Sequence, residues 1–238
     1  MEHLKIVASA RQLPEHQVTN QELSHIMDTN DDWIFSRTGI HQRHIVTTEN
    51  TSDLATSVAK QLLDKSGIKA DSLDFIIVST MSPDSLSPST AAMVQGAIGA
   101  NHAFAFDLSA ACSGFVYGLS VATSLLSTRY RRGLVIGSEV LSKLVDWQDR
   151  TTAVLFGDGA AGVLVETTTE NIGLLGEQLR TYGNKGDNLV AGQFANKNPF
   201  AGEISPVDPY FHQNGREVYN FATREVPEVL QAALEEAE

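Results

Sequence analysis

The single cysteine of the 238-residue chain, Cys112, lies in the stretch DLSAACSGFVYGL, between a strand-like run and a helix-like run. Free backbone amides and the helix dipole at such a junction favour a thiolate, which is the nucleophilic form of cysteine. The small neighbours leave room for a substrate at the sulfur, and the apolar residues that follow would keep the site dry. Most lone cysteines are small buried hydrophobic residues, and that alternative stays open on these residues alone. Cys112 is therefore a candidate nucleophile.

The elements that must position Cys112 alternate between strand and helix, which predicts an α/β fold. Strands are expected at residues 4–10, 73–81, 103–108 and 133–140, in a β-rich pair over 151–159 and 160–168, and at 171–183. A long connection rich in glycine and asparagine, from Gly183 to about Gly215, is expected to be a surface loop.

Capping signals mark two helices in the first third of the chain. In TNQEL, Thr19 and Glu22 have the spacing of a capping box, in which each side chain bonds the other residue's backbone amide. A longer helix is expected to begin with Ser52 as its cap and to end at Gly67, which tolerates the left-handed conformation of a helix end.

Three further helices are expected. One follows Pro88 through STAAMVQGAIGA, one begins directly after Cys112, and one covers residues 216–238 with a kink at Pro227. The helix after Cys112 is apolar around nearly its whole circumference, so it is predicted to lie inside a core.

The composition argues against several classes of partner. The net charge of −12 and the pI near 4.9 disfavour nucleic acid or an anionic membrane, because both require excess Lys and Arg. The uncharged run Leu108–Thr128 is too rich in serine and threonine to span a bilayer, and the basic stretch RYRRG, Arg129–Gly133, is interpreted as a solvated helix end. The first residues lack a secretory-signal pattern, so a cytoplasmic protein is expected.

Two motif-like features are interpreted as structural. GDGAAG matches G-x-G-x-x-G at Gly157, Gly159 and Gly162, but a dinucleotide fingerprint must open a helix, and here a β-branched strand continues. These glycines are expected to allow close approach between strands. The seven histidines are scattered, and only His41 and His44 lie close together, without a ligand set at metal spacing. Neither a metal site nor a resident cofactor is expected.

Four stretches occur along the chain in the order DDWIFSRTGIHQRHI, DLSAACSGFVYGL, DRTTAVLFGDGAAGVLVE and GREVYNFA. Together they closely resemble the β-ketoacyl-acyl carrier protein synthase III family, condensing enzymes of the thiolase superfamily. The resemblance runs from about residue 4 to the end of the chain. It implies a thiolase-like α/β fold of two similar αβα halves packed in layers, with residues 1–169 as the first half and 170–238 as an incomplete second half.

The resemblance also implies an activity. The family carries out the initiating condensation of type II fatty acid synthesis. An acetyl or short branched acyl group passes from acyl-coenzyme A, as substrate, through a cysteine thioester to malonyl-acyl carrier protein, with loss of carbon dioxide. Family members are homodimers, so a homodimer is expected. The partner subunit contributes a residue from the loop near DSLSPST to the acyl pocket, and here Ser87 stands where an aromatic residue often stands.

Site residues carry over position by position from the resemblance. Cys112 matches the acyl-accepting residue, and Trp33 matches the residue that stacks on the adenine of coenzyme A. Arg37 and Arg150 match the basic residues beside that nucleotide, where planar guanidinium groups suit stacking and phosphate binding. Thr29 is a weaker match at the same entrance.

Two aromatic residues are matched to the acyl-binding region. Phe156, beside the glycines of FGDGAAG, corresponds to the wall of the acyl pocket, and Tyr219 corresponds to an aromatic residue near the pantetheine tunnel. Core packing is the alternative interpretation for each of them.

The family's mechanism also uses a histidine and an asparagine, in motifs of the type PHQAN and GN that lie beyond this chain's last helix. Those side chains stabilise the enolate that forms when malonyl loses carbon dioxide, and the histidine helps to activate the thiol. The chain is therefore expected to be a C-terminally truncated form that lacks the decarboxylation machinery. His212, in PYFHQNGREV, has none of the expected flanking residues and is not assigned that role.

Two alternatives from other classes remain. A non-catalytic fragment or scaffold of the same family would keep the coenzyme A residues only by inheritance and would show no covalent chemistry at Cys112. A cysteine peptidase or redox sensor would need a histidine partner or nearby cationic groups, and the run 108–128 carries no charge. Neither alternative gives Trp33, Arg37 and Arg150 a shared role.

Overall fold

The computed structural model describes residues 3–170, 172–203 and 206–238. Its centre is a five-stranded sheet in the order β1-β7-β6-β4-β5. The strands are β1 His3–Gln12, β4 Phe75–Ser79, β5 Phe104–Leu108, β6 Arg132–Val140 and β7 Asp158–Thr168. β4 runs parallel to β5 and β6, and β7 runs antiparallel to β6 and β1. The sequence therefore gives a mixed sheet whose parallel strands β4 and β5 both end next to the Cys112 segment.

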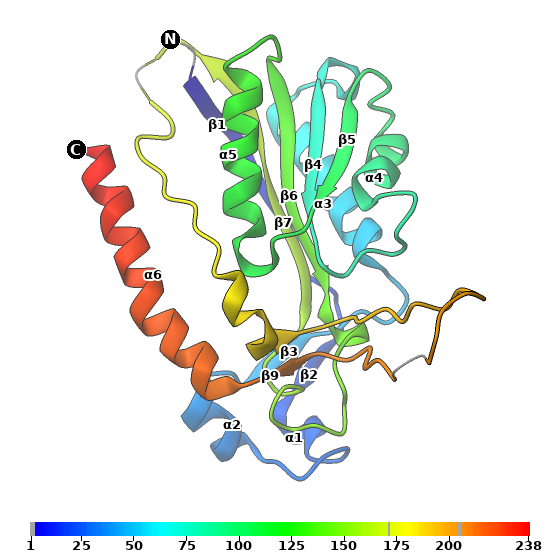
Figure 1. The fold of residues 1–238 in the computed structure, drawn as a ribbon. Helices are drawn as coiled ribbons and strands as arrows, with labels where there is room; N and C mark the ends of the chain where they lie inside the picture. The colour runs from blue at the N-terminus through cyan, green and yellow to red at the C-terminus, as the bar shows by residue number, and fades with distance from the viewer. Residues whose placement is uncertain (1–2, 171, 204–205) are drawn as a thin grey trace.

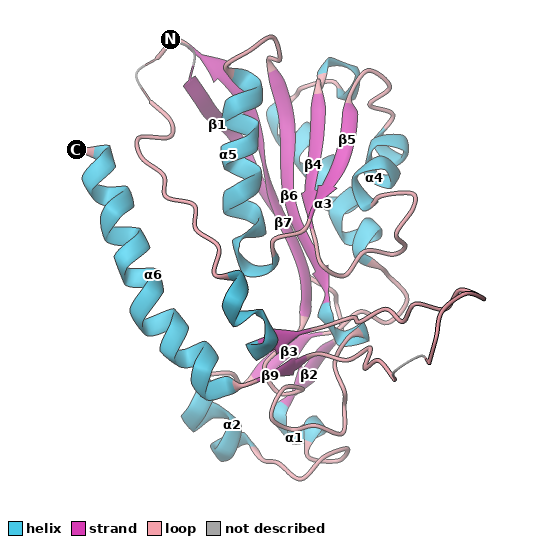
Figure 2. Ribbon diagram, in the orientation of Figure 1, coloured by secondary structure: helices cyan, strands magenta, loops and turns pink. Residues whose placement is uncertain are grey.

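Helices cover both faces of the sheet (Figures 1 and 2). α3 Thr51–Ser66 and α4 Thr90–Ile98 pack on one face, and α5 Gly114–Leu126 packs on the other. Side chains of β4 alternate between the layers: Ile76 belongs to the core under α3 and α4, whereas Phe75 and Ile77 belong to the core under α5. All five β4 residues are buried, as the apolar run predicts.

Shorter elements surround the end of the sheet near Cys112. They are β2 Gln17–Thr19, α1 Asn20–Leu23, α2 Asp31–Thr38, β3 Gln42–His44, β8 Leu189–Val190 and β9 His212–Gln213, with short 3-10 turns η2 Ala111–Ser113, η3 Leu141–Lys143 and η4 Gly183–Asn188. A further 3-10 turn, η1 Ala70–Ser72, precedes β4 at the opposite end of the sheet, where the Ser72 hydroxyl accepts a hydrogen bond from Arg132 at the start of β6. A third apolar cluster joins α1 and α2 to residues 145–156. α6 Gly215–Ala237 lies apart from the sheet, beside the extended segment 172–182 (Figure 1). No helix within the described ranges is long and apolar enough to cross a bilayer.

The capping signals are confirmed at three of four positions. Thr19 and Glu22 form the predicted capping box, and Gly67 ends α3 with a φ of 70°. Ser52 was expected to cap α3, but this expectation is wrong, because Asn50 caps the helix in a capping box of its own with Asp53. The Ser52 hydroxyl instead donates a hydrogen bond of 2.6 Å to Asp84, on the loop after β4.

Two predicted strands are absent from the described residues. The segment 151–157 is a turn rather than the first strand of a pair, because the Asp149 carboxylate accepts hydrogen bonds from the Thr151 amide and the Thr152 hydroxyl. GDGAAG then leads into β7, as expected, and not into a helix. Residues 172–182 are extended but pair with no strand, and residue 171 lies outside the described residues.

The helix after Cys112 is buried along one stripe only, whereas its composition predicts burial on all sides. Gly114, Gly118, Ala122 and Leu126 of α5 are buried, whereas Val116 is 54% exposed. A single sheet can bury only one stripe of a helix, and the opposite stripe of α5 has no second sheet against it within the described residues. The division at residue 169 between two halves stays a prediction, although all five strands of the large sheet end by Thr168.

Two glycines let α5 approach the sheet closely. A Cβ on Gly118 would lie 2.9 Å from Val135 Cγ1 and 3.2 Å from Ser79 Oγ, and a Cβ on Gly114 would lie 3.0 Å from Ser79 Cβ. The Ser79 hydroxyl donates a hydrogen bond of 2.8 Å to the Gly114 carbonyl. The position of α5, and with it that of Cys112, therefore depends on the absence of side chains at these two turns.

Replacement of Gly118 by Val should lower the free energy of unfolding by about 1–3 kcal/mol, because the added side chain overpacks the contact with β4 and β6. Gly96→Ala is the matched control, since a Cβ at this α4 position meets no atom within 4 Å. The control should raise stability by about 0.5–1 kcal/mol. Urea denaturation measures both, and a Gly118→Val protein as stable as the wild type would contradict the packing argument.

Candidate active site

Cys112 lies at the turn from β5 to α5, at the end of the sheet where β4 and β5 finish (Figure 1). The segment before it is anchored, because the Asp107 carboxylate accepts hydrogen bonds of 2.8 and 2.7 Å from the first amides of α4, at Thr90 and Ala91. Ala111 has a φ of 46°, a conformation that is uncommon for a residue with a Cβ. The strained turn points to a functional position and leaves Cys112 exposed.

The Cys112 side chain lines a cavity of about 460 Å³. Small residues of β6 and β7 form one side of it, and Phe115 of α5 forms another; the full lining is Arg11, Leu13, Ser79, Ala111, Cys112, Phe115, Gly137, Ser138, Glu139, Gly159, Ala160 and Ala161. Because Gly137, Gly159, Ala160 and Ala161 carry at most a methyl group, they leave space beside the sulfur. This arrangement favours the nucleophile interpretation over that of a buried hydrophobic residue.

The start of α5 offers hydrogen-bond donors near the sulfur. Ser113 caps α5 without a side-chain hydrogen bond, so the first amides of the helix have no partner from the cap. The dipole of a 13-residue helix adds partial positive charge at this end. Both effects favour negative charge near the start of α5, such as that of an oxyanion.

Glu139 lines the same cavity, and its role was not predicted from the sequence. Its carboxylate accepts hydrogen bonds from the Met81 amide at 2.8 Å and from the hydroxyls of Thr80 and Ser82. Burial raises the pKa of Glu139 despite these hydrogen bonds. An isolated carboxylate in the apolar stretch GLVIGSEV was the available signal in the sequence. Through these hydrogen bonds Glu139 holds the loop after β4 beside the cavity.

The structure brings Trp33, Arg37 and Arg150 together, as the resemblance implies. The Arg37 and Arg150 guanidinium carbons lie 4.6 and 5.1 Å from the centroid of the Trp33 ring. Trp33 and Arg37 come from α2, one helical turn apart, and the Arg37 guanidinium donates to the Trp33 carbonyl at 3.1 Å. We call these three residues the arginine–tryptophan stack. Arg37 and Arg150 are exposed, whereas Trp33 is half-buried against the third apolar cluster.

Residues beside the stack supply further polar groups. Arg150 donates a hydrogen bond of 2.7 Å to the Asp28 carbonyl. The hydroxyl of the neighbouring Thr29 is buried and has no hydrogen-bond partner among the described residues. A buried hydroxyl without a partner is costly, and a ligand at this position would satisfy it. α2 and the start of α5 lie at the same end of the sheet (Figure 1).

Phe156 and Tyr219 are placed away from the cavity lining. Phe156 packs edge-on against Phe211, with ring centroids 4.6 Å apart, in the cluster below α1 and α2. Tyr219 lies on α6 and is 68% exposed. Neither side chain is among the residues that line the Cys112 cavity, so their assignment to the acyl pocket and the pantetheine tunnel stays a prediction.

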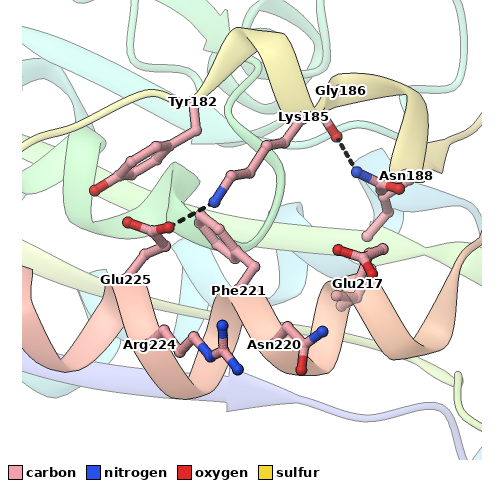
Figure 3. Close-up of a pocket in the computed structure, with 11 residues that line it drawn as sticks. Tyr182, Lys185, Gly186, Asn188, Glu217, Asn220, Phe221, Arg224 and Glu225 are labelled. Atoms are coloured by element: carbon pink, nitrogen blue, oxygen red, sulfur yellow. Dashed lines mark hydrogen bonds and ion pairs between the residues drawn. The ribbon is translucent and has the colours of Figure 1, made fainter.

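A separate cavity of about 370 Å³ lies between η4 and α6 (Figure 3). Lys185 occupies its centre: its ammonium group bonds Glu225 at 2.5 Å and lies 5.3 and 5.6 Å from the ring centroids of Tyr182 and Phe221. These contacts join η4 to α6, and the charged groups neutralise each other. The contacts of Lys185 therefore hold α6 against η4, and this cavity shares no lining residue with the Cys112 cavity.

The basic stretch 129–133 is remote from both sites. It follows the C-terminal end of α5, whereas Cys112 precedes the N-terminal end, and a 13-residue helix spans about 20 Å. Arg132 is used in an ion pair of 2.9 Å with Glu166. The interpretation as a solvated helix end is wrong for Arg132 and Gly133, which begin β6, because Arg132 is drawn into the sheet by Glu166 on β7.

Cys112 thus stands at the start of a helix that packs on one face of a mixed sheet, and comparison with known proteins places this arrangement in the thiolase-like class of α/β condensing enzymes. A family model described as 3-oxoacyl-[acyl-carrier-protein (ACP)] synthase III matches residues 106–183. The β-ketoacyl-[acyl-carrier-protein] synthase III of Lactococcus lactis subsp. cremoris (strain MG1363) is 52% identical, over 100% of this chain and 73% of the relative. The enzyme of the same name from Lactobacillus delbrueckii subsp. bulgaricus (strain ATCC BAA-365 / Lb-18) is 56% identical, again over 100% of this chain and 73% of the relative.

The fold agrees with a solved structure of the same kind. The crystal structure of 3-oxoacyl-[acyl-carrier-protein] synthase III from Aquifex aeolicus VF5 superposes with a TM-score of 0.89 at 38% identity, over 98% of this chain and 72% of the other. The chain belongs to the β-ketoacyl-acyl carrier protein synthase III family, the condensing acyltransferases that initiate fatty acid synthesis. The family and the thiolase-like fold predicted from the four sequence stretches are thereby confirmed.

The Glu139 carboxyl should make stability depend on pH. Its pKa is raised in the folded protein above the ordinary value of 4.5, so its contribution is fully present below that value and is lost as pH rises through the folded pKa. Glu139→Gln should remove this loss, so the wild type should become less stable relative to the variant as pH increases.

Glu49→Gln is the control of opposite sign, because backbone amides of residues 47–49 lower the Glu49 pKa. The stabilisation from Glu49 is present above the ordinary value and is lost as pH falls. Thermal unfolding from pH 4 to pH 8 measures both variants, and a difference between wild type and Glu139→Gln that does not change with pH would contradict the assignment.

Proposed function

We propose that Cys112 is the acyl-accepting nucleophile of an initiating condensation between acyl-coenzyme A and malonyl-acyl carrier protein. The observation that carries this proposal is the exposed sulfur at the unpartnered start of α5, facing a cavity lined by small residues. The names of the relatives agree with an acyl carrier protein as the second partner. The resemblance implies that the acyl donor is an acetyl or short branched thioester.

The first half-reaction is a thioester exchange. The Cys112 thiolate attacks the carbonyl carbon of the acyl group, and the first amides of α5 stabilise the oxyanion that forms. The intermediate collapses as the bond to the coenzyme A sulfur breaks, and that sulfur leaves as a thiolate that takes up a proton. The acyl group remains on Cys112.

The second half-reaction forms the carbon–carbon bond. Malonyl-acyl carrier protein loses carbon dioxide, and the electron pair of the broken bond becomes an enolate that attacks the thioester carbonyl on Cys112. The Cys112 thiolate leaves, and the β-ketoacyl group stays on the carrier protein. The enolate needs stabilising donors, which the resemblance assigns to a histidine and an asparagine beyond α6.

The arginine–tryptophan stack is proposed to bind the nucleotide end of coenzyme A. An indole ring stacks on adenine, and guanidinium groups pair with phosphate oxygens. Thr29, with its unpartnered hydroxyl, would donate to the same ligand. Coenzyme A is a substrate in this scheme, and none of its steps calls for a resident cofactor or metal.

A homodimer is proposed in keeping with the resemblance. β5 lies at the open edge of the sheet and presents Phe104 and Phe106, an edge on which a second copy can pair. In such a dimer the partner would supply part of the acyl pocket from the loop that carries Ser87.

Incubation with acetyl-coenzyme A should add one acetyl group to the protein. The first half-reaction needs only Cys112, the first amides of α5 and the proposed coenzyme A site. Intact-protein mass spectrometry with peptide mapping over residues 107–119 locates the adduct. Cys112→Ser should fold normally and stay unmodified. A folded wild type without any adduct from acetyl or branched acyl donors would favour the scaffold alternative.

Replacement of Arg37 or Arg150 by Ala should weaken coenzyme A binding by about 10- to 100-fold each, because each loses a charged contact to the nucleotide, which is typically worth about 1.5–3 kcal/mol. Isothermal titration calorimetry measures the dissociation constants. Arg129→Ala is the matched control, since it removes an exposed arginine that lies over Tyr130 at the other end of α5. Unchanged affinity in both Arg37 and Arg150 variants would remove the stack from the site.

A further inference from the structure

The arginine–tryptophan stack is assembled from two segments that are far apart in the chain. Trp33 and Arg37 come from α2, whereas Arg150 comes from the turn that leads to Val154. All three planar groups must keep their spacing to within a fraction of an ångström if adenine and phosphate are to be bound together. The guanidinium groups of the stack are exposed, and the two segments are joined beneath it by the apolar cluster of Ile34 and Val154 and by buried hydrogen bonds.

Arg43 of β3 contacts the segment that follows Arg150. Only 5% of Arg43 is exposed, and its Nη2 donates a hydrogen bond of 3.1 Å to the Val154 carbonyl. The same nitrogen donates to Asn20 Oδ1 at 2.8 Å, and Nη1 donates to the Val18 carbonyl at 3.2 Å. One buried guanidinium therefore links the Arg150 turn to β2 and α1.

Asn20 continues the link to α2. Its side chain is 1% exposed, and Nδ2 donates hydrogen bonds of 2.7 Å to Asp31 Oδ1 and 2.7 Å to the Ile40 carbonyl. Asp31 is the first residue of α2, and Ile40 directly follows the glycine that ends it. A single amide thus holds both ends of the helix that carries Trp33 and Arg37.

Burial of the Arg43 guanidinium costs solvation free energy, which a purely structural contact does not require. Among the residues that the structure describes, Arg43 donates its hydrogen bonds to neutral oxygens, and its Nε is buried without a partner. Burial lowers the pKa of Arg43. A buried charge without a carboxylate is weak evidence for stability, because apolar residues of similar volume often stabilise a core as well or better. A role in geometry explains its presence better than a role in stability.

We propose that Arg43 and Asn20 form a buried bracket that positions the nucleotide-binding stack, holding α2 in register with the Arg150 turn. The inference rests on the proposed coenzyme A site and adds two positioning residues to it. Neither residue touches the acyl group or Cys112 in this scheme. Loss of the bracket should therefore impair recognition of the nucleotide and spare the chemistry at the sulfur.

Two acyl donors separate these effects. Acetyl-coenzyme A and acetyl-pantetheine share the thioester and its arm, but only the former carries the nucleotide. The rate constant for acetylation of Cys112 by each donor, followed by intact-protein mass spectrometry, gives a ratio that reports nucleotide recognition alone. Arg43→Met and Asn20→Ala should each lower the rate with subsaturating acetyl-coenzyme A about tenfold, and each should leave the rate with acetyl-pantetheine within about twofold.

Arg132→Met is the matched control. It removes an arginine that is partly buried, whereas Arg43 is fully buried. Arg132 pairs with Glu166 at 2.9 Å, at the end of β6 that is remote from Cys112. The variant should lose stability without changing the ratio between the two donors. If Arg43→Met does not fold, as judged by near-UV circular dichroism, Asn20→Ala decides, since it cuts the same link while Arg43 remains.

The outcomes separate the bracket from the site it serves. Equal loss with both donors, or no loss with either, would overturn the bracket. Trp33→Ala tests the site itself and should also lower only the rate with acetyl-coenzyme A. If Trp33→Ala changes the ratio but the bracket variants do not, the bracket alone is wrong. If Trp33→Ala leaves the ratio unchanged, the proposed coenzyme A site is wrong, and the bracket falls with it.

Discussion

The close contact between α5 and the sheet decides where the Cys112 sulfur lies. Gly118 brings the helix backbone to within van der Waals reach of Val135 and Ser79, and the Ser79 hydroxyl holds the first carbonyl of the helix. A helix fixed in this way directs its first amides toward the carboxyl ends of β4 and β5. The strained turn at Ala111 then leaves the sulfur at the cavity, since the chain must pass from strand to helix within a few residues.

The same constraint explains the character of the cavity. Side chains on β6 and β7 that face α5 change from Val135 and Val163, deep under the helix, to Gly137 and Ala161 beside Cys112. Large residues there would fill the space that a thioester needs. Glu139, near the end of β6, lines the cavity and accepts hydrogen bonds from the loop after β4, so the apolar packing of the sheet gives way to polar contacts where substrate is proposed to bind.

The two proposed halves of the substrate site rest on different kinds of support. Cys112 depends on apolar packing between a helix and a sheet, which tolerates little change in volume. The arginine–tryptophan stack depends on the polar bracket of Arg43 and Asn20, together with the small apolar cluster that contains Ile34 and Val154. Packing positions the reactive atom, while directional hydrogen bonds position the groups that recognise a planar, charged ligand.

Local patterns in the sequence were enough to predict the capping box at Thr19, the end of α3 at Gly67, and the strand-to-helix junction at Cys112. These features depend on neighbours within a few residues, whose hydrogen bonds and periodicity can be read from the chain. The four stretches were also enough to predict the family. The cap of α3 was misplaced because Asn50 and Ser52 both suit that role, and Ser52 is drawn away by Asp84, on a distant loop.

Tertiary structure decided what depends on residues far apart in the chain. The bracket from Val154 through Arg43 and Asn20 to α2 has no local signal, because each hydrogen bond joins a different pair of segments. The turn at Thr151 and Thr152, and the exposed stripe of α5, likewise follow from which surfaces meet. The sequence alone was enough to predict the family, the ends of several elements and the place of Cys112 at a strand-to-helix junction, because these depend on neighbouring residues. Only the folded chain decided how Glu139 lines the cavity and how Trp33 meets Arg150, because long-range contacts depend on the path of the whole chain.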